Sequence, residues 1–162
     1  MENFVNELKA GWPDETQLAR VLIRLTAAVL LGAVIGFQRE TLGKPAGLRT
    51  HMLVAGGAAL FVVACAESGM SSEGLSRVVQ GLATGIGFIG AGAILKLVEE
   101  REITGLTTAA SIWMTAALGV ASGMGRWGSA VISAALTWII LAALGRMEFR
   151  KERKESKGAD HR

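Results

Sequence analysis

Charged side chains gather where the first two apolar segments of the chain meet. Arg39 and Glu40 follow the first segment, and Arg49 stands near the start of the second. A guanidinium and a carboxylate form strong, directional hydrogen bonds, so this corner could lock two helices together or hold an ion or a lipid headgroup. The simpler interpretation is that basic residues beside a membrane span fix its orientation, although that role gives no reason for Glu40. Both interpretations stay open at this point.

Hydroxyl side chains stand near the same boundary and near a later one. The candidate polar corner therefore comprises Arg39, Glu40, Arg49, Thr50, Thr107 and Thr108. These threonines, like Ser111, either bond between membrane helices or cap helix N-termini, and capping is the simpler role. His51 has no second ligand nearby, and the sequence has no nucleophile–base set, metal-ligand cluster or phosphate loop. We therefore expect no catalytic residue, no metal, no cofactor and no enzymatic activity.

Membrane helices must position these residues, because the chain is too apolar for a soluble domain. Hydrophobic residues make up 51% of its 162 residues, and its mean hydropathy is +0.40. Apolar runs of about 20 residues are long enough to cross a bilayer as helices. We predict an all-α integral membrane protein with about five transmembrane helices. The expected spans are residues 21–37, 52–66, 78–98, 106–122 and 128–145.

The distribution of basic residues predicts how these helices cross the membrane. With the N-terminus outside and the C-terminus in the cytoplasm, twelve lysines and arginines lie on the cytoplasmic side and four outside, as the positive-inside rule favours. Arg24 lies within the first span and is expected to reach toward its outer end. The chain then divides into an extracytoplasmic segment (1–17), a transmembrane domain (18–145) and a basic cytoplasmic tail (146–162). Orientation thus accounts for the basic residues, and the expected partner is the lipid bilayer, not nucleic acid.

An internal repeat relates the two polar boundaries. At an offset of 58 residues, Gly47-Leu48 matches Gly105-Leu106, and Thr50 matches Thr108. In the predicted topology both copies lie at the cytoplasmic face, where the chain re-enters the membrane. The repeat therefore predicts two parallel helix-pair repeats followed by a fifth helix, and some transporters have repeats of this kind. At the other end of the first helix, Asp14 and Gln17 have the spacing of a capping box.

Glycines are concentrated in the third predicted span. They are Gly81, Gly85, Gly87, Gly90 and Gly92. Three of them fit the dinucleotide-binding pattern G-x-G-x-x-G, but they lie inside an apolar run and not between a strand and a soluble helix, so we do not expect nucleotide binding. Small residues let membrane helices approach closely, and we predict helix packing here. Local unwinding that exposes carbonyl groups to a cavity is the alternative.

Four motifs, in this order along the chain, resemble the MgtC/SapB family. They are Gly36-Phe37-Gln38-Arg39-Glu40, Ala46-Gly47-Leu48-Arg49-Thr50-His51, the run from Gly85 to Gly92, and the run from Gly105 to Trp113. The resemblance covers Ala19 to Gly145. It implies a bacterial inner-membrane protein associated with growth in low magnesium and, in pathogens, with persistence in the host. Several members also carry a C-terminal domain resembling the ACT fold, so we expect this chain to be a short form.

Two functions are consistent with this resemblance. The first is regulation of other membrane proteins, bound through the glycine-lined helices, with a second copy of the chain as a further expected partner. The alternative is a small ion or solute transporter, related to magnesium, that uses the parallel repeats. Transporters usually bury paired ionisable groups at mid-membrane, and none of the predicted spans has a clear pair. In addition, Gln38 stands where many members carry an acid, which weakens any anionic cluster at the corner.

Overall fold

The computed structural model describes residues 1, 4, 11–94 and 104–159, with the backbone alone described from residue 144 onward. Within these residues the elements are α2 (Glu15–Thr41), α3 (Leu48–Glu67), α4 (Ser72–Ile94), α5 (Leu106–Gly123) and α6 (Trp127–Ala159). The first four of these helices are long and apolar enough to cross a membrane, and α6 begins with a shorter apolar stretch, Trp127–Ala143. The prediction of an all-α membrane protein is confirmed.

Polar residues at the helix ends make several helices longer than the apolar spans alone predict. The capping box forms at the start of α2, where the Gln17 N–H donates to Asp14 Oδ1 at 2.8 Å and the Asp14 N–H donates to Gln17 Oε1 at 3.1 Å. With 27 residues, α2 is about 40 Å long, which exceeds the hydrocarbon thickness of about 30 Å. Its ends therefore reach the polar regions on both sides. Helix α6 also continues past the predicted boundary at residue 145.

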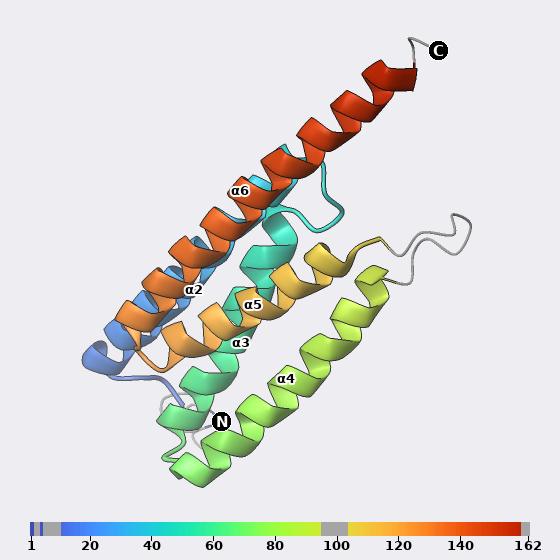
Figure 1. Cartoon of the computed structure of the whole chain (residues 1–162). Coiled ribbons are helices and arrows are strands. Elements are labelled where there is room, and N and C mark those ends of the chain that lie inside the picture. The colour runs from blue at the N-terminus through green and yellow to red at the C-terminus, as the bar shows by residue number, and fades with distance from the viewer. Residues whose placement is uncertain (2–3, 5–10, 95–103, 160–162) are drawn as a thin grey trace.

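The helices alternate in direction along the chain. Helices α2, α4 and α6 run one way, and α3 and α5 run the other (Figure 1). The pairs α2–α3 and α4–α5 therefore have the same sense, as the repeat predicted. Helix α5 is central and packs against α2, α3, α4 and α6. Helix α4 lies at the edge of the bundle and packs mainly against α5 (Figure 1).

Small residues bring α2 and α5 close to α3. A Cβ atom at Gly32 of α2 would lie 2.6 Å from the carbonyl oxygen of His51, and one at Gly123 of α5 would lie 2.8 Å from that of Ala59. Ala55 and Ala59 of α3, which receive these helices, are fully buried. Lipid tails are as apolar as the side chains, so close packing and hydrogen bonds between helices, and not the hydrophobic effect, hold the helices together.

The glycines predicted to pack helices lie in α4 and behave differently. Gly90 alone among the five is buried, and a Cβ atom there would lie 3.6 Å from the Cβ of Ala109. At Gly81, Gly85, Gly87 and Gly92 a Cβ atom would meet no neighbouring helix within 4 Å. Helix α4 is continuous through all five positions, so the alternative of local unwinding is wrong. Among the described residues no neighbouring helix packs on these four glycines, and their packing against another protein stays a prediction.

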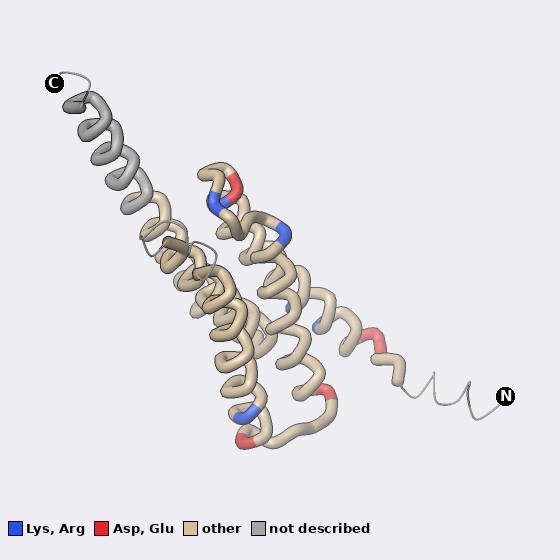
Figure 2. The backbone as a smooth tube through the Cα atoms, turned by 90° about the vertical axis from the view of Figure 1, so that its right-hand side faces the viewer, with Lys and Arg blue, Asp and Glu red and all other residues tan. Residues whose placement is uncertain are grey.

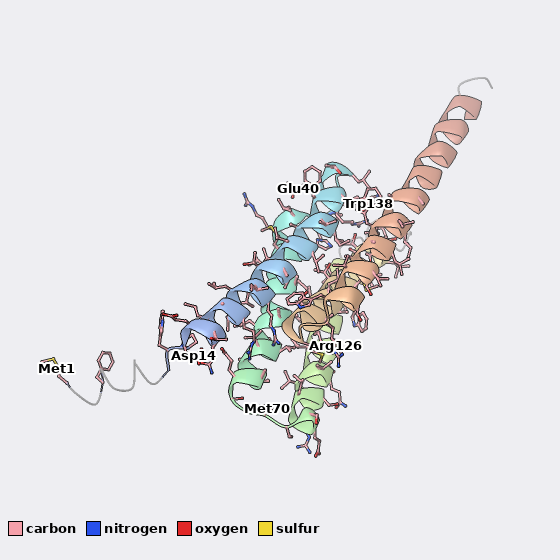
Figure 3. The ribbon with its side chains drawn as sticks, turned by 90° about the vertical axis from the view of Figure 1, so that its left-hand side faces the viewer. Met1, Asp14, Glu40, Met70, Arg126 and Trp138 are labelled. Carbon is pink, nitrogen blue, oxygen red and sulfur yellow. The ribbon has the colours of Figure 1, made fainter. Side chains whose placement is uncertain are left out.

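Charged residues lie toward the ends of the described helices, and the helix middles contain few Lys, Arg, Asp or Glu residues (Figure 2). Glu40 and Trp138 lie toward one end of the bundle, and Asp14, Met70 and Arg126 lie toward the other (Figure 3). Alternation of the helices therefore places the α2–α3 corner and the C-terminal half of α6 on the same side, as the predicted topology requires.

Candidate functional site

The end of α2 carries a buried arginine. Arg39 is in the last turn of the helix and is only 3% exposed. Its Nη2 donates to Thr108 Oγ1 at 2.6 Å, which ties α2 to the first turn of α5. A guanidinium keeps its charge in proteins, so burial is expensive unless hydrogen bonds compensate. The C-terminal end of a helix is also the favourable end for a positive charge.

A buried histidine continues this polar cluster into α3. His51 is fully buried. Its Nδ1 lies 2.9 Å from the Gly47 carbonyl oxygen, and its Nε2 lies 3.2 Å from Ser111 Oγ. A carbonyl only accepts, so Nδ1 carries the hydrogen, and in the neutral ring Nε2 is an acceptor. The Ser111 hydroxyl, which also lies 2.8 Å from the Thr108 carbonyl oxygen, then has two competing acceptors.

Glu40 joins α2 to the start of α3, whereas the preceding residue, Arg39, joins α2 to α5. Its Oε2 accepts a hydrogen bond from the Leu48 N–H at 2.8 Å, although the side chain is exposed. The carboxylate therefore satisfies an open N–H at the start of α3, where the helix dipole favours negative charge. This contact fastens α2 to α3 and supplies a reason for Glu40 that topology alone did not give.

The prediction that threonine caps α3 and α5 is wrong. Gly47 and Gly105 are the N-cap residues, and neither helix start has a capping bond from its N-cap side chain. Gly105 has φ +91°, and a Cβ atom there would lie 2.5 Å from the Ala93 carbonyl oxygen. Gly47 is extended, with φ −104°, and a Cβ atom there would lie 2.7 Å from Glu40 Oε2. Glycine is thus required at position 105 by a left-handed backbone and a close backbone contact, whereas a Cβ atom at position 47 would meet only the end of the flexible Glu40 side chain.

The predicted corner residues separate into two groups. Arg39 and Thr108 come together in the buried cluster, and Glu40 lies at its edge. Arg49 and Thr107 are exposed, and Thr50 is half-buried. The sequence interpretation missed His51 as a buried group. One sequence signal pointed to a polar face that could receive a buried side chain such as His51. Thr108, Ser111 and Thr115 recur at helical intervals on α5, and in the structure all three are buried.

Two further polar bonds join the helices away from this cluster. At the opposite end of the bundle, Arg24 Nη1 donates to the Gly123 carbonyl oxygen at 2.8 Å, at the C-terminus of α5. Arg24 was expected near the outer end of the first span, and the structure has it bonded to the end of α5. Gln38 Nε2 donates to the Trp138 carbonyl oxygen at 3.4 Å, between α2 and α6.

The cluster has the properties of a structural lock. Its buried hydrogen bonds run between α2, α3 and α5, and the described residues contain no group of three or more His, Cys, Asp or Glu that could hold a metal ion. A depression of about 370 Å³ lies elsewhere, on the outer face of α2 between Leu22 and Leu30. The chemistry of the cluster is therefore hydrogen bonding between helices.

The helices are apolar and are joined to one another by buried hydrogen bonds. These two features define the chain as a small helical membrane protein. A family model described as the MgtC family matches residues 25–150, and the chain belongs to this family. The matched region includes every residue of the buried cluster, from Arg39 to Ser111. The resemblance that the four motifs indicated is confirmed.

Several curated relatives share this region. SrpB of Synechococcus elongatus is 46% identical over 136 residues, covering 77% of this chain and 75% of SrpB. YhiD of Escherichia coli strain K12, which is named as a candidate magnesium transporter, is 40% identical over 139 residues, covering 82% of this chain and 64% of YhiD. Protein MgtC of Salmonella typhimurium strain LT2 is 43% identical over 122 residues, covering 75% of this chain and 50% of MgtC. No solved structure matches the chain.

Proposed function

We propose that this chain is a regulator in the bacterial inner membrane that supports growth when magnesium is scarce, and that it acts by binding another integral membrane protein. Membership of the MgtC family and the names of MgtC and YhiD support the connection with magnesium. The proposed role is binding and not catalysis. The observation that carries the proposal is the open face of α4.

One row of α4 has the composition of a helix-packing surface, and none of the described helices packs on it. Gly81, Gly85 and Gly92 fall close together around the helix at about 100° per residue, and all three are exposed. Within the chain, glycines of α2 and α5 meet the backbone of α3 directly. The same residue type in α4 therefore provides a flat surface onto which a helix of another protein can pack. We call Gly81, Gly85 and Gly92 the glycine row.

The polar cluster supports binding over transport. Arg39, His51, Thr108 and Ser111 lie at the ends of their helices and bond to groups on neighbouring helices. Groups engaged in this way rigidify a bundle, and moving a solute past them would require several buried bonds to break. A rigid scaffold with an open helix at its edge suits a protein that docks onto another.

Transport of a cation is the second candidate, and one observation favours it. Arg39 and His51 are ionisable side chains buried in a membrane bundle, and such groups commonly mark ion or proton pathways. Purified protein reconstituted in liposomes separates the two functions. The regulator predicts no magnesium flux above that of empty liposomes, and a flux that Arg39→Met abolishes would establish the carrier.

Site-specific crosslinking in native membranes tests the binding surface. A photoreactive residue at Ile89, which is 45% exposed on α4 and borders the glycine row, should form an adduct with another integral membrane protein and leaves the three glycines unchanged. The matched control is the same residue at Leu30, which is 60% exposed on the outer face of α2. Adducts at both positions, or at neither, would contradict docking through α4.

A further inference from the structure

A second row of α4 is polar, which is unusual for an exposed helix face in a membrane. Four side chains, Glu73, Arg77, Gln80 and Thr84, recur at intervals of three or four residues, and Gly87 and Ala91 continue the row. We call these six residues the polar row. At about 100° per residue, the polar row and the glycine row are centred about a quarter-turn apart, and both point away from α5. All six residues of the polar row are exposed.

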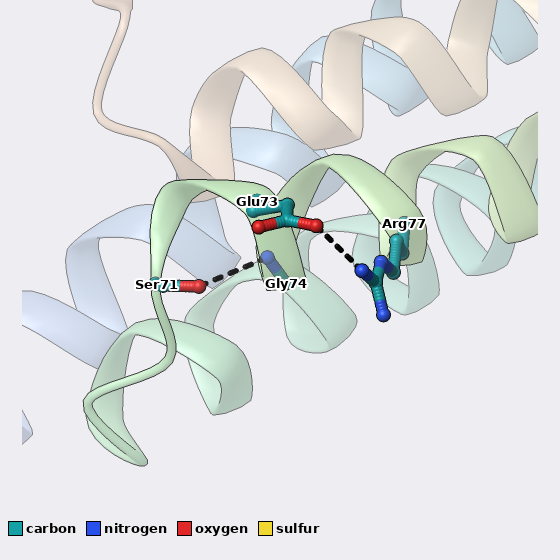
Figure 4. A network of polar contacts seen from close by, with 4 residues as sticks. All are labelled: Ser71, Glu73, Gly74 and Arg77. Carbon is teal, nitrogen blue, oxygen red and sulfur yellow. Dashed lines mark hydrogen bonds and ion pairs between the residues drawn. The ribbon is translucent and has the colours of Figure 1, made fainter.

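The beginning of the polar row is an ion pair at the membrane boundary. Arg77 Nη2 lies 2.5 Å from Glu73 Oε1, with the two side chains 75% and 77% exposed (Figure 4). In the same turn the Gly74 N–H donates to Ser71 Oγ at 3.2 Å, which fixes the start of α4 (Figure 4). One helix face therefore presents a negative and a positive group a single turn apart.

Gln80 lies deeper, at a level where lipid cannot satisfy it. It is eight residues into the candidate span Ser72–Ile94, or about 12 Å from the helix start. Thr84 Oγ1 is satisfied within the helix, because it donates to the Gln80 carbonyl oxygen at 3.0 Å. Among the described residues, the side-chain amide of Gln80 has no hydrogen-bond partner. Lipid tails offer no donor or acceptor, so an exposed amide at this depth favours a protein neighbour with a matching group.

A second copy of this chain carries groups that can pair with the polar row, at the same depths in the membrane. All copies enter the membrane in one orientation, so a two-fold axis along the membrane normal would pair α4 with α4 in parallel, residue against like residue. Glutamine can pair with itself, because its amide both donates and accepts. Glu73 of each copy can also meet Arg77 of the other, and Gly87 and Ala91 are small enough to let the helices approach closely.

We propose that two copies of this chain pair in parallel through the polar row of α4, with Gln80 of each copy bonded to Gln80 of the other. The pairing goes beyond the proposed regulatory function and uses a different row of the same helix. The glycine row stays open in the dimer for a membrane partner.

Disulfide crosslinking in native membranes tests the pairing. In a Cys65→Ala background, Thr84→Cys should give a dimer on oxidation, because residue 84 lies near the centre of the proposed interface. The matched control is Thr26→Cys, since Thr26 stands 58 residues earlier at the equivalent repeat position and is exposed on α2. A dimer from Thr84→Cys alone supports the proposal. No dimer from Thr84→Cys, or equal dimer from both variants, overturns it.

The contribution of Gln80 is measured by resonance energy transfer between labelled copies in liposomes. Gln80→Leu should weaken association by about 3- to 30-fold, the range expected for loss of hydrogen bonds between membrane helices. Thr26→Leu is the matched polar-to-apolar control on α2 and should leave association unchanged. Association that is equal for wild type and Gln80→Leu would overturn pairing through Gln80.

Outcomes for the two rows separate this proposal from the regulatory one. Gly85→Leu should remove the adduct that the photoreactive residue at position 89 forms with a membrane partner, and it should keep the Thr84→Cys dimer. Gly87→Leu should weaken the dimer, whereas Gly57→Leu on α3 should not, although a Cβ atom at either glycine meets no neighbouring helix within 4 Å. A dimer that persists in Gly87→Leu at wild-type strength would contradict the assigned interface and leave docking through the glycine row unaffected.

Discussion

At the scale of single residues, the bundle is organised around buried polar groups that need particular partners. Arg39 is compensated in part by Thr108, and His51 lies between Gly47 and Ser111. Removing one partner of a buried charged group costs more than the bond itself contributes, because the remaining group is left without its compensation. Stability should therefore respond sharply to changes at Thr108.

Thr108→Val should lower the free energy of unfolding by about 1.5–3 kcal/mol, the usual range for a hydrogen bond to a charged group. Valine keeps the shape of threonine and removes the oxygen that accepts from Arg39. Thr107→Val is the matched control, because Thr107 is the adjacent residue and is exposed. Denaturant titration in mixed micelles gives both values, and equal stability of the two variants would show that the Arg39–Thr108 bond is unimportant.

The sequence predicted only part of this cluster. Arg39 and Thr108 were candidates because of their types and their positions at membrane boundaries, but they stand 69 residues apart and their contact depends on the packing of α2 on α5. His51 could not be recognised as a partner of Ser111, because a lone histidine near an apolar run has no visible neighbour until α5 is placed. Threonine's capping preference was a misleading guide, since glycine and Glu40 perform that role for α3.

At the scale of helices, glycine determines where the chain can turn and how closely helices approach. Gly105 combines a left-handed backbone with close contact to the preceding helix, whereas Gly43 has φ +64° and open space around it. Substitutions at these two positions therefore distinguish the cost of a left-handed backbone from the added cost of a steric clash.

Gly43→Ala should cost about 1–2 kcal/mol of unfolding free energy, the price of a left-handed conformation for a residue with a Cβ. Gly105→Ala should cost about 1–3 kcal/mol more, because its Cβ would also press on the Ala93 carbonyl oxygen, 2.5 Å away. Thermal unfolding of the two variants in the same detergent measures the difference. A smaller effect at Gly105 than at Gly43 would mean that the α4–α5 corner does not hold the position described.

At the scale of the whole molecule, the alternation of apolar and charged segments was enough to predict the helices and their parallel pairs. Extended apolar runs define spans by length alone, and the capping box defined the start of α2. The central position of α5 and the edge position of α4 were not predictable, because similar small residues occur in every span. Which glycines pack inside the chain depends on contacts between helices that are distant in sequence.

The orientation in the membrane is a prediction of the same charge pattern. The C-terminus should lie in the cytoplasm and the N-terminus outside, because this places most basic residues inside. A C-terminal fluorescent-protein fusion should be bright, and a C-terminal alkaline phosphatase fusion should be inactive. Active phosphatase at the C-terminus would reverse the topology and place the Arg39 cluster at the outer face.

Docking of a membrane partner on the glycine row is tested most directly by growth in low magnesium. In a strain that depends on this chain for that growth, Gly85→Leu should abolish it, because leucine fills the surface onto which the partner packs. Gly57→Leu, which makes the same change at another open glycine, should support growth like the wild-type chain. Wild-type growth with Gly85→Leu, at equal protein levels in the membrane, would contradict the proposal.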